Sequence, residues 1–218
     1  MISLVESSLI SELGAHLPAL DESNAILIKG LPVNDQTSRN DIFSEIVKVL
    51  GAPRCYLASR YGENPVHLLA EPSPPLVDQG LDWHTEDAFA RVPPAFVALL
   101  CLEGDTSVRT HLCRLIGPDP EARVYGWTRP DPYLYAEGAA ELLPLAFTTD
   151  RGTGWRYDPA LIAAESADVP CPVLDGDSHQ HCVLDQGDLL VFDNHTLAHA
   201  RDAANPTGRR RVLRMILA

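Results

Sequence analysis

The sequence predicts an α+β protein with a mainly β core, a cupin-like jelly roll of the kind called a double-stranded β-helix, with helices packed outside it. Helical patterning is confined to about the first 52 residues, whereas the remainder contains short β-rich runs separated by Pro, Gly and Asp clusters. The 218 residues, 45% of them hydrophobic, suffice for a real core. We therefore expect one domain over residues 1–218.

The first 52 residues are predicted to contain two amphipathic helices and one strand. Apolar residues over 3–17 lie roughly on one helical face, and the segment 37–51 repeats this pattern. Between them AILIKG, starting at Ala25, is a short apolar run that Gly30 closes, which predicts a buried strand. No catalytic pattern occurs in this region.

Residues 53–218 are predicted to form the β core. The runs that predict strands are NPVHLLA, GLDWHTE, AFVALLCLE, VRTHLCRL, LPLAFTT, CPVLDG, DLLVFDN and RRRVLRMILA. Between about 117 and 158, many Pro, Gly and aromatic residues instead indicate a long insert. Long loops in compact domains are commonly lids or binding loops, so we expect a lid here. The alternative is a solvated excursion without a role.

Composition argues against several classes of partner. The net charge of −13 and the pI near 4.9 disfavour a nucleic-acid partner, which needs clustered basic residues. The five cysteines are odd in number and form no CxxC pair, which is typical of a reducing compartment. The chain has neither a long apolar run nor a signal-peptide pattern at its start. We expect a cytoplasmic enzyme without a membrane partner, of open oligomeric state.

The clearest chemical pattern is the string WHTED, in which His84 and Glu86 are two residues apart. Residues i and i+2 of a strand project to the same face, so this pair supplies two ligands of a two-histidine, one-carboxylate iron(II) site. The third ligand must come from a distant strand, and GDLLVFDNHTLAHAR offers His195 and His199. His199 is favoured because His195 would lie within the turn itself. The alternative is that the two side chains lie on the surface of a strand and bind no metal, which is the commoner case for a lone HxE pair.

An arginine cluster downstream of His199 gives the HxE pair its context. The run RRRVLR, residues 209–214, lies on the predicted last strand. A dicarboxylic co-substrate that chelates iron through its 2-oxo acid end leaves a distal carboxylate, which a guanidinium group pairs in bidentate fashion. Arg210 and Arg214 share one strand face. The alternative, a solvated basic edge that deters aggregation, suits Arg209 and Arg211.

The strings GLDWHTEDAF, AFVALLCL, GDLLVFDN and HAR resemble the clavaminate synthase-like branch of the taurine dioxygenase superfamily. The resemblance covers about residues 61–218 and is patchy between 117 and 169. It implies an Fe(II)- and 2-oxoglutarate-dependent dioxygenase that uses O2 to hydroxylate an unactivated carbon of a free amino acid or derivative, in specialised metabolism such as antibiotic biosynthesis. Glu86 stands where halogenases of the superfamily have a small residue, so halogenation is disfavoured.

Carried over by position, the resemblance makes His84, Glu86 and His199 the iron ligands and Arg210 the partner of the distal 2-oxoglutarate carboxylate. Thr110 adds a hydrogen bond to that carboxylate, with Thr106 as its rival, and Arg214 faces the acidic group of the substrate or of the co-substrate. Further candidates for substrate binding are His67, Gln79, Asp87, Arg91, Asp150, Trp155, Arg156 and Asp158.

The roles of these further candidates are less specific. A cationic substrate would need desolvated carboxylates, which Asp150 or Asp158 can supply. Asp87 alternatively orients His84 or Arg201 from behind. The bland alternative for each is an ordinary loop residue.

The sequence departs from this branch in two ways. The chain is much shorter than its amino-acid hydroxylases, and the interval from His199 to the arginines is nearer that of taurine dioxygenase. Two alternatives therefore stay open. The same site could perform desaturation or cyclisation or act on a larger, carrier-tethered substrate, or the chain could be a non-catalytic metal-binding β-barrel. Arg210 argues against the non-catalytic barrel, because a structural metal site needs no arginine to bind a dicarboxylate. Such a site favours closed coordination by four protein ligands.

Overall fold

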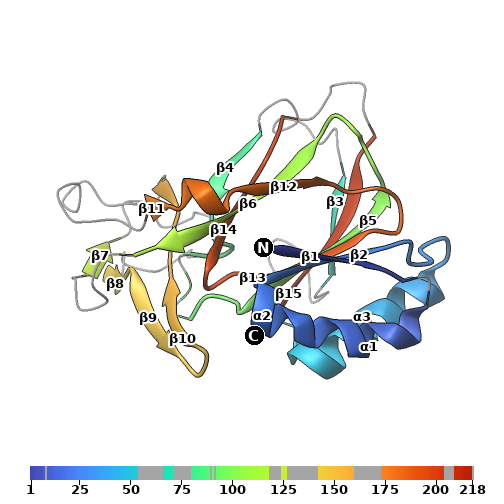
Figure 1. Cartoon of the computed structure of the whole chain (residues 1–218), viewed down its shortest axis with the longest axis horizontal. Coiled ribbons are helices and arrows are strands. Elements are labelled where there is room, and N and C mark those ends of the chain that lie inside the picture. The colour runs from blue at the N-terminus through green and yellow to red at the C-terminus, as the bar shows by residue number, and fades with distance from the viewer. Residues whose placement is uncertain are drawn as a thin grey trace, which may run out of the picture.

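The computed structural model describes residues 1–7, 9–53, 66–70, 80–88, 90, 92–117, 124–126, 142–159, 173–203 and 209–217. Its described part is mainly β, with few helices and several sheets in which antiparallel pairing dominates (Figure 1). This confirms the β-dominated fold that the sequence predicts. Among the described residues, no helix is long and apolar enough to cross a membrane.

The larger sheet has six strands. Its order is β1 (Ile2–Glu6), β2 (Ala25–Lys29), β13 (Leu189–Asp193), β5 (Phe96–Glu103), β15 (Arg211–Leu217) and β3 (Val66–Ala70). Every pairing in it is antiparallel except that of β1 with β2. The strands β2, β5 and β13 are almost wholly buried, which explains why they read as continuous apolar runs in the sequence.

The second sheet contains the residues of the candidate site. Its order is β11 (Val173–Leu174), β6 (Arg109–Ile116), β14 (Leu197–Arg201) and β4 (Leu81–His84), and β12 (Gln180–Val183) also pairs with β6. Two further pairs join β9 (Ala146–Thr149) to β10 (Gly152–Trp155) and β7 (Val124–Gly126) to β8 (Leu142–Pro144).

Two hydrophobic clusters form the core, one on each face of the larger sheet. On one face, Ile28, Leu100 and Val191 pack with apolar residues of the N-terminal helices, among them Ile42 and Ile46. On the other face, Leu27, Leu99 and Phe192 pack with residues of the second sheet, among them Leu112 and Leu197. The alternation of Ile28 and Leu27 along β2 follows from the two-residue period of a strand. The second sheet therefore faces the larger sheet across a packed interior.

The helix predicted over 37–51 is confirmed as α3 (Gln36–Leu50). Asp35 caps it, since its carboxylate accepts a hydrogen bond of 2.9 Å from the backbone N–H of Ser38. Gly51 ends it with a φ of 94°, a conformation that favours glycine. The strand predicted at AILIKG is also confirmed, as β2.

The helix predicted over 3–17 is wrong. Residues 2–6 form strand β1, which pairs in parallel with β2 at the edge of the larger sheet. Only short helical turns follow, namely η1 (Ile10–Glu12), α1 (Leu13–His16), η2 (Leu17–Ala19) and α2 (Leu20–Ser23). Gly14 and Pro18 disfavour a continuous helix here, and strand pairing with β2 satisfies the backbone of the first residues instead.

Each of the eight runs predicted to be strands contains at least part of one. The described residues of the long insert predicted over 117–158 include the strands β7 to β10. Its residues 118–123 and 127–141, with Trp127 and Tyr133, lie outside the described residues. Together with AILIKG, the eight runs leave out the strands β1, β7, β10, β12 and β14.

Candidate metal centre

Two histidines of the candidate triad face each other across neighbouring strands. His84 at the end of β4 is directly paired with His199 in β14, and their ring centroids lie 4.1 Å apart. Directly paired residues of antiparallel strands share a face, so both imidazoles project from the same side of the sheet. Close approach of the two strands requires Gly80 just before β4, where an added Cβ would lie 2.5 Å from the backbone oxygen of Arg201.

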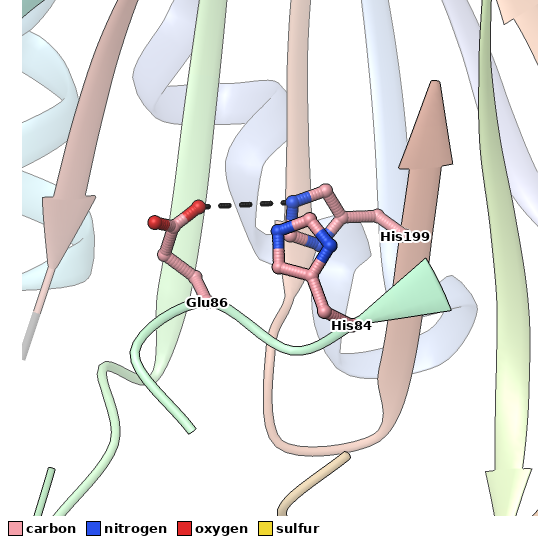
Figure 2. A group of neighbouring side chains, drawn as sticks. All are labelled: His84, Glu86 and His199. Carbon is pink, nitrogen blue, oxygen red and sulfur yellow. Dashed lines mark ion pairs between the residues drawn. The ribbon is translucent and has the colours of Figure 1, made fainter. Parts of the chain in front are cut away.

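Glu86 completes the triad from a turn. Its Oε2 lies 3.7 Å from Nε2 of His199, and one ligand atom of each of the three residues lies within 4.8 Å of the others. Figure 2 shows the carboxylate directed toward the two overlapping imidazole rings. The sequence argument had placed His84 and Glu86 on one extended strand. β4 ends at His84, and Glu86 follows in a turn whose next residue, Asp87, has a left-handed φ of 48°.

Asn194 holds the backbone of Glu86 in place. The Glu86 N–H donates to Asn194 Oδ1 at 2.6 Å, and Asn194 Nδ2 donates to the carbonyl of Glu86 at 3.0 Å and to that of Pro94 at 3.0 Å. Asn194 is completely buried, so water cannot replace these bonds. Its amide thus fixes the position of the ligand carboxylate from a segment more than a hundred residues away.

A second set of bonds fastens the ligand turn to the segment after β10. The N–H of Thr85 donates to the Tyr157 carbonyl at 2.7 Å, and the N–H of Tyr157 donates to Thr85 Oγ1 at 3.0 Å. Arg156, buried and adjacent, donates to the carbonyls of Ala88 at 3.0 Å and Ala90. Arg156 therefore contributes to the shape of the turn, in addition to any role toward a substrate.

Burial and neighbouring charges favour the neutral form of the His199 imidazole. Burial lowers the pKa of His199 well below its usual value, and the neighbouring His84 and Arg214 lower it further. His84 Nδ1 lies 2.7 Å from the carbonyl oxygen of Asp82, which can only accept, so Nδ1 carries a hydrogen and Nε2 is the nitrogen that can serve as a metal ligand. Arg214 Nη1 donates to Glu86 Oε1 at 2.5 Å. Two imidazoles and one carboxylate on one side are the ligand set of non-haem iron(II) sites.

Two neighbouring arginines lie near the strand that carries His199, Arg210 buried and Arg201 half-buried. Arg210 is 5% exposed, and burial lowers its pKa. Arg201 in β14 has a pKa lowered to about 10, first by burial and then by the positive charge of Arg210. Thr110 is paired directly with Arg201, so it shares the face that carries His199 two residues before.

The alternatives for these positions differ in burial and location. Thr110 is buried, whereas its rival Thr106 is exposed in a turn. His195, the rival of His199, lies in the turn before β14, and its Nε2 is 3.1 Å from the carbonyl oxygen of Pro93. Arg209 and Arg211 are exposed, as the basic-edge alternative expects for them.

The remaining substrate candidates are scattered. Asp87 adjoins the ligand Glu86, and Trp155 and Asp158 are half-buried around the Tyr157 contact. Asp150 is exposed at the tip of the β9–β10 hairpin. The backbone of His67 in β3 is paired with that of Arg214. The His67 side chain, together with Gln79 and Arg91, lies outside what the structure describes.

Sequence reasoning missed Asn194 as a functional residue and mentioned Arg201 only as a partner for Asp87. The signal for Arg201 was present, because it follows His199 at a strand spacing of two residues. No comparable signal marks Asn194, which was read only as a turn residue. Its role depends on how the turn before β14 meets the turn after β4.

Comparison with protein-family models and with curated proteins finds no match. Solved structures do match. An asparagine oxygenase in complex with Fe(II), 2S,3S-3-hydroxyasparagine and succinate is 19% identical, with a TM-score of 0.73 over 95% of this chain and 79% of that chain. The non-haem iron oxygenase OrfP in complex with Fe and α-ketoglutaric acid is 19% identical, with a TM-score of 0.74 over 95% of this chain and 80% of that chain.

This chain has the fold of these oxygenases. OrfP in complex with Fe and L-Arg is similar to the same extent, with 19% identity and a TM-score of 0.71 over 95% of this chain and 80% of that chain. The agreement extends over nearly the whole chain.

Proposed function

We propose that the protein is an Fe(II)- and 2-oxoglutarate-dependent dioxygenase of the clavaminate synthase-like branch, which hydroxylates an unactivated carbon of a free amino acid or derivative. The observation that carries this proposal is the convergence of His84, Glu86 and His199 on one face of the second sheet. The fold supports it, because solved oxygenases with this fold are complexes with iron, 2-oxoglutarate or succinate, and amino acids.

His84 Nε2, His199 Nε2 and a Glu86 oxygen would hold the iron. Their grouping on one side leaves the opposite side of the metal for co-substrate and dioxygen. Bound iron, with 2-oxoglutarate and O2, supplies the oxidising power and leaves succinate and carbon dioxide as by-products. Asn194 and Tyr157 contribute by holding the ligand turn, so that the carboxylate reaches the metal without reorganisation.

Arg210 would bind the distal carboxylate of 2-oxoglutarate, with a hydrogen bond from Thr110. The proximity of Arg201 supports this, since its pKa is lowered by burial and by Arg210. Two neighbouring guanidinium groups repel each other, and a carboxylate bound near both would offset this repulsion. A bidentate guanidinium–carboxylate pair fits a rigid dicarboxylic co-substrate.

Arg214 would bind an acidic group of the substrate, or of the co-substrate, next to the metal. It now donates to Glu86, a proposed iron ligand, so its guanidinium already lies within reach of the metal. An amino-acid carboxylate would compete with Glu86 for this guanidinium. His67, Asp87, Asp150, Trp155 and Asp158 remain candidates for binding the rest of the substrate.

The finer assignments belong to the same proposal. We propose that the chain is one jelly-roll domain over residues 1–218, with 1–52 as its N-terminal region and 53–218 as its β core. This is supported by the two sheets, which face each other across a packed interior, and by the helices on the far side of the larger sheet. We also propose a cytoplasmic location, a small amino-acid-like substrate and a role in specialised metabolism. Desaturation, cyclisation or a carrier-tethered substrate would use the same residues.

The decisive experiment measures succinate. The protein is purified without oxygen, supplied with Fe(II) and 2-oxoglutarate and exposed to air, with and without each of a panel of L-amino acids that includes asparagine and arginine. We expect succinate to rise with one amino acid and to vanish in His84→Ala. A low rate that no amino acid changes but that is lost in His84→Ala would redirect the search to larger substrates. Absence of succinate in every reaction would favour the non-catalytic barrel.

Two arginine variants separate the roles of the two carboxylates. Arg210→Leu should raise the KM for 2-oxoglutarate by about tenfold or more, because one charge-assisted pair contributes about 1.5–3 kcal/mol. Arg214→Leu should instead raise the KM for the amino acid and change that for 2-oxoglutarate much less. Equal effects of both variants on both constants would contradict the assignment.

A further inference from the structure

A second group of histidines lies on the opposite face of the sheet that carries the triad. His111 in β6 is paired directly with His181 in β12 and with Ala200 in β14. His179 precedes β12, after the single turn η5 (Gly176–Ser178). Because successive residues of a strand alternate between faces, His111 points away from the face of its neighbour Leu112, which is paired with His199. The strands β12, β6, β14 and β4 lie side by side (Figure 1).

The nitrogen atoms of this outer group are arranged for more than a surface contact. His111 Nδ1 lies 3.1 Å from His179 Nε2, and His111 Nε2 lies 2.9 Å from Asp202 Oδ1. An ionised carboxylate only accepts, so Asp202 places the hydrogen of His111 on Nε2 and leaves the Nδ1 lone pair directed at His179. A carboxylate that orients an imidazole in this way is the usual partner of a metal-binding histidine.

The third imidazole is close to the first two. The ring centroid of His181 is 5.8 Å from that of His111 and 6.3 Å from that of His179. Trp83 borders the group, with its ring centroid 5.5 Å from that of His179 and 6.1 Å from that of His111. His179 and His181 are exposed, so the group is open to ions from solution.

We propose that His111, His179 and His181 bind a divalent transition-metal ion, with Asp202 orienting His111. Two imidazole nitrogens that each lie about 2.0–2.1 Å from one ion are about 2.9–3.4 Å apart, for angles from square to tetrahedral. The 3.1 Å between His111 and His179 falls in this range. The exposed His181 would have to change its side-chain rotamer to reach the ion.

The donor set selects the metal. Three imidazoles without a carboxylate ligand favour Cu(II), Ni(II) and Zn(II) over Fe(II), Mn(II) and Mg(II), in contrast to the His84, Glu86 and His199 site. In the metal-free protein, His179 Nε2–H donates to His111 Nδ1. The ion takes the place of this hydrogen, and His179 then carries its hydrogen on Nδ1, by exchange with water. The net charge of −13 favours cation uptake at such a surface.

The site would join three separate segments of the chain. His111 belongs to β6, His179 and His181 to the segment around β12, and Asp202 to the end of β14, where its second oxygen accepts from the N–H of Arg109 at 3.1 Å. An ion bound only by the folded protein stabilises it by mass action. Addition of Zn(II) should therefore raise the midpoint of thermal unfolding, by an amount that grows with the free Zn(II) concentration.

The test uses metal-free full-length protein and Zn(II) alone. His84→Ala weakens the triad, so equilibrium dialysis of this variant at micromolar Zn(II) should find one ion per chain. Adding His179→Ala and His181→Ala to it should abolish that ion, whereas adding His16→Ala, a histidine of α1, should not. Both outer substitutions are at exposed positions, so the fold should tolerate them. Equal Zn(II) binding with and without the outer histidines, or binding only at millimolar Zn(II), would overturn the proposal.

Two further readouts distinguish a metal site from a hydrogen-bonded patch. Asp202→Asn should weaken Zn(II) binding by about 10- to 100-fold without abolishing it, as expected for a group that orients a ligand. Cu(II) bound to the His84→Ala variant should show the magnetic resonance splitting of several imidazole nitrogens. A Cu(II) spectrum without nitrogen splitting, or one unchanged by His179→Ala, would contradict the site.

Discussion

The two faces of the second sheet carry histidines with opposite surroundings. On the inner face, His199 is buried and neutral, and it lies beside the carboxylate of Glu86 and the guanidinium of Arg214. On the outer face lies His111 of β6, the residue before Leu112, which is paired with His199. His111 is only partly buried, and its neighbours His179 and His181 are exposed. The same residue type in the same sheet is therefore placed in two different chemical environments.

The difference shows that the surroundings of the imidazoles decide which kind of metal ion each face can bind. The inner face combines two imidazoles with an acidic ligand and cationic neighbours, which suits a metal that must also accept an anionic co-substrate. The outer face offers imidazoles alone, in contact with water, which suits a metal that needs no further anion. Changes at equivalent positions of the two faces should therefore have unequal effects.

The largest effect is expected for His199→Ala. Removal of an iron ligand should lower the rate of 2-oxoglutarate turnover by about a thousandfold or more, because loss even of an outer partner of a metal ligand commonly reduces activity by about 10- to 100-fold. The matched change on the outer face, His181→Ala, should leave turnover within about a factor of two of the unmodified protein. Succinate formation measures both. Equal losses in the two variants would erase the distinction between the faces.

Thiol labelling compares the reaction rate of the buried Cys182 with that of an ordinary exposed cysteine. Burial raises the pKa of Cys182, whose residue is paired with Thr110 on the inner face, to about 11. Since only the thiolate reacts, its rate with iodoacetamide at pH 7.5 should be about two orders of magnitude below that of an ordinary thiol with a pKa near 8.5. Peptide mass spectrometry after timed labelling measures this rate. Rapid labelling of Cys182 in the folded protein would mean that the inner face is open to solvent.

Asn194→Ala tests the support of the inner face. The substitution leaves the N–H and the carbonyl of Glu86 without their buried partner, and each such loss costs about 1–3 kcal/mol. We expect the free energy of unfolding to fall by about 3 kcal/mol, measured by urea denaturation, and iron affinity to fall as well. Asn40→Ala, at an exposed amide pair in α3, is the control and should change stability by less than about 0.5 kcal/mol. A loss of stability without a loss of iron affinity would separate Asn194 from the metal centre.

The smallest effect is expected for His181→Ala in the absence of added metal. His181 is exposed, so its truncation should change the free energy of unfolding by less than about 0.5 kcal/mol. Urea denaturation in a chelating buffer measures this. A larger loss would assign His181 a structural role that does not depend on a bound ion.

Much of the fold and the triad was predictable from local patterns. The run AFVALLCLE is apolar at every position but the last, which is how a strand covered on both faces reads, and it forms β5. The triad was predictable because a histidine and a carboxylate two residues apart, followed far downstream by a histidine and an arginine cluster, are rare together. These features depend on short spacings that the sequence displays directly.

The remaining features depend on which segments meet. Residues 2–6 alternate weakly enough to suit either a helix or a strand, and pairing with β2 decides between them. The contact of Asn194 with Glu86 joins two turns, so neither segment reveals it alone. His179 and His181 are two residues apart, as in a strand face, yet His111 joins them only because β12 pairs with β6 in a particular register.

That register also limits how the length of the chain can vary. β14 presents His199 and Arg201 to the interior and Ala200 to the outside, in direct pairing with Leu112, Thr110 and His111 of β6. Insertion or deletion of one residue inside β14 would shift all later positions to the opposite face. Single-residue length changes should therefore be tolerated in the turns that precede and follow β14 but not between His199 and Arg201, and insertion scanning of this segment would map the boundary.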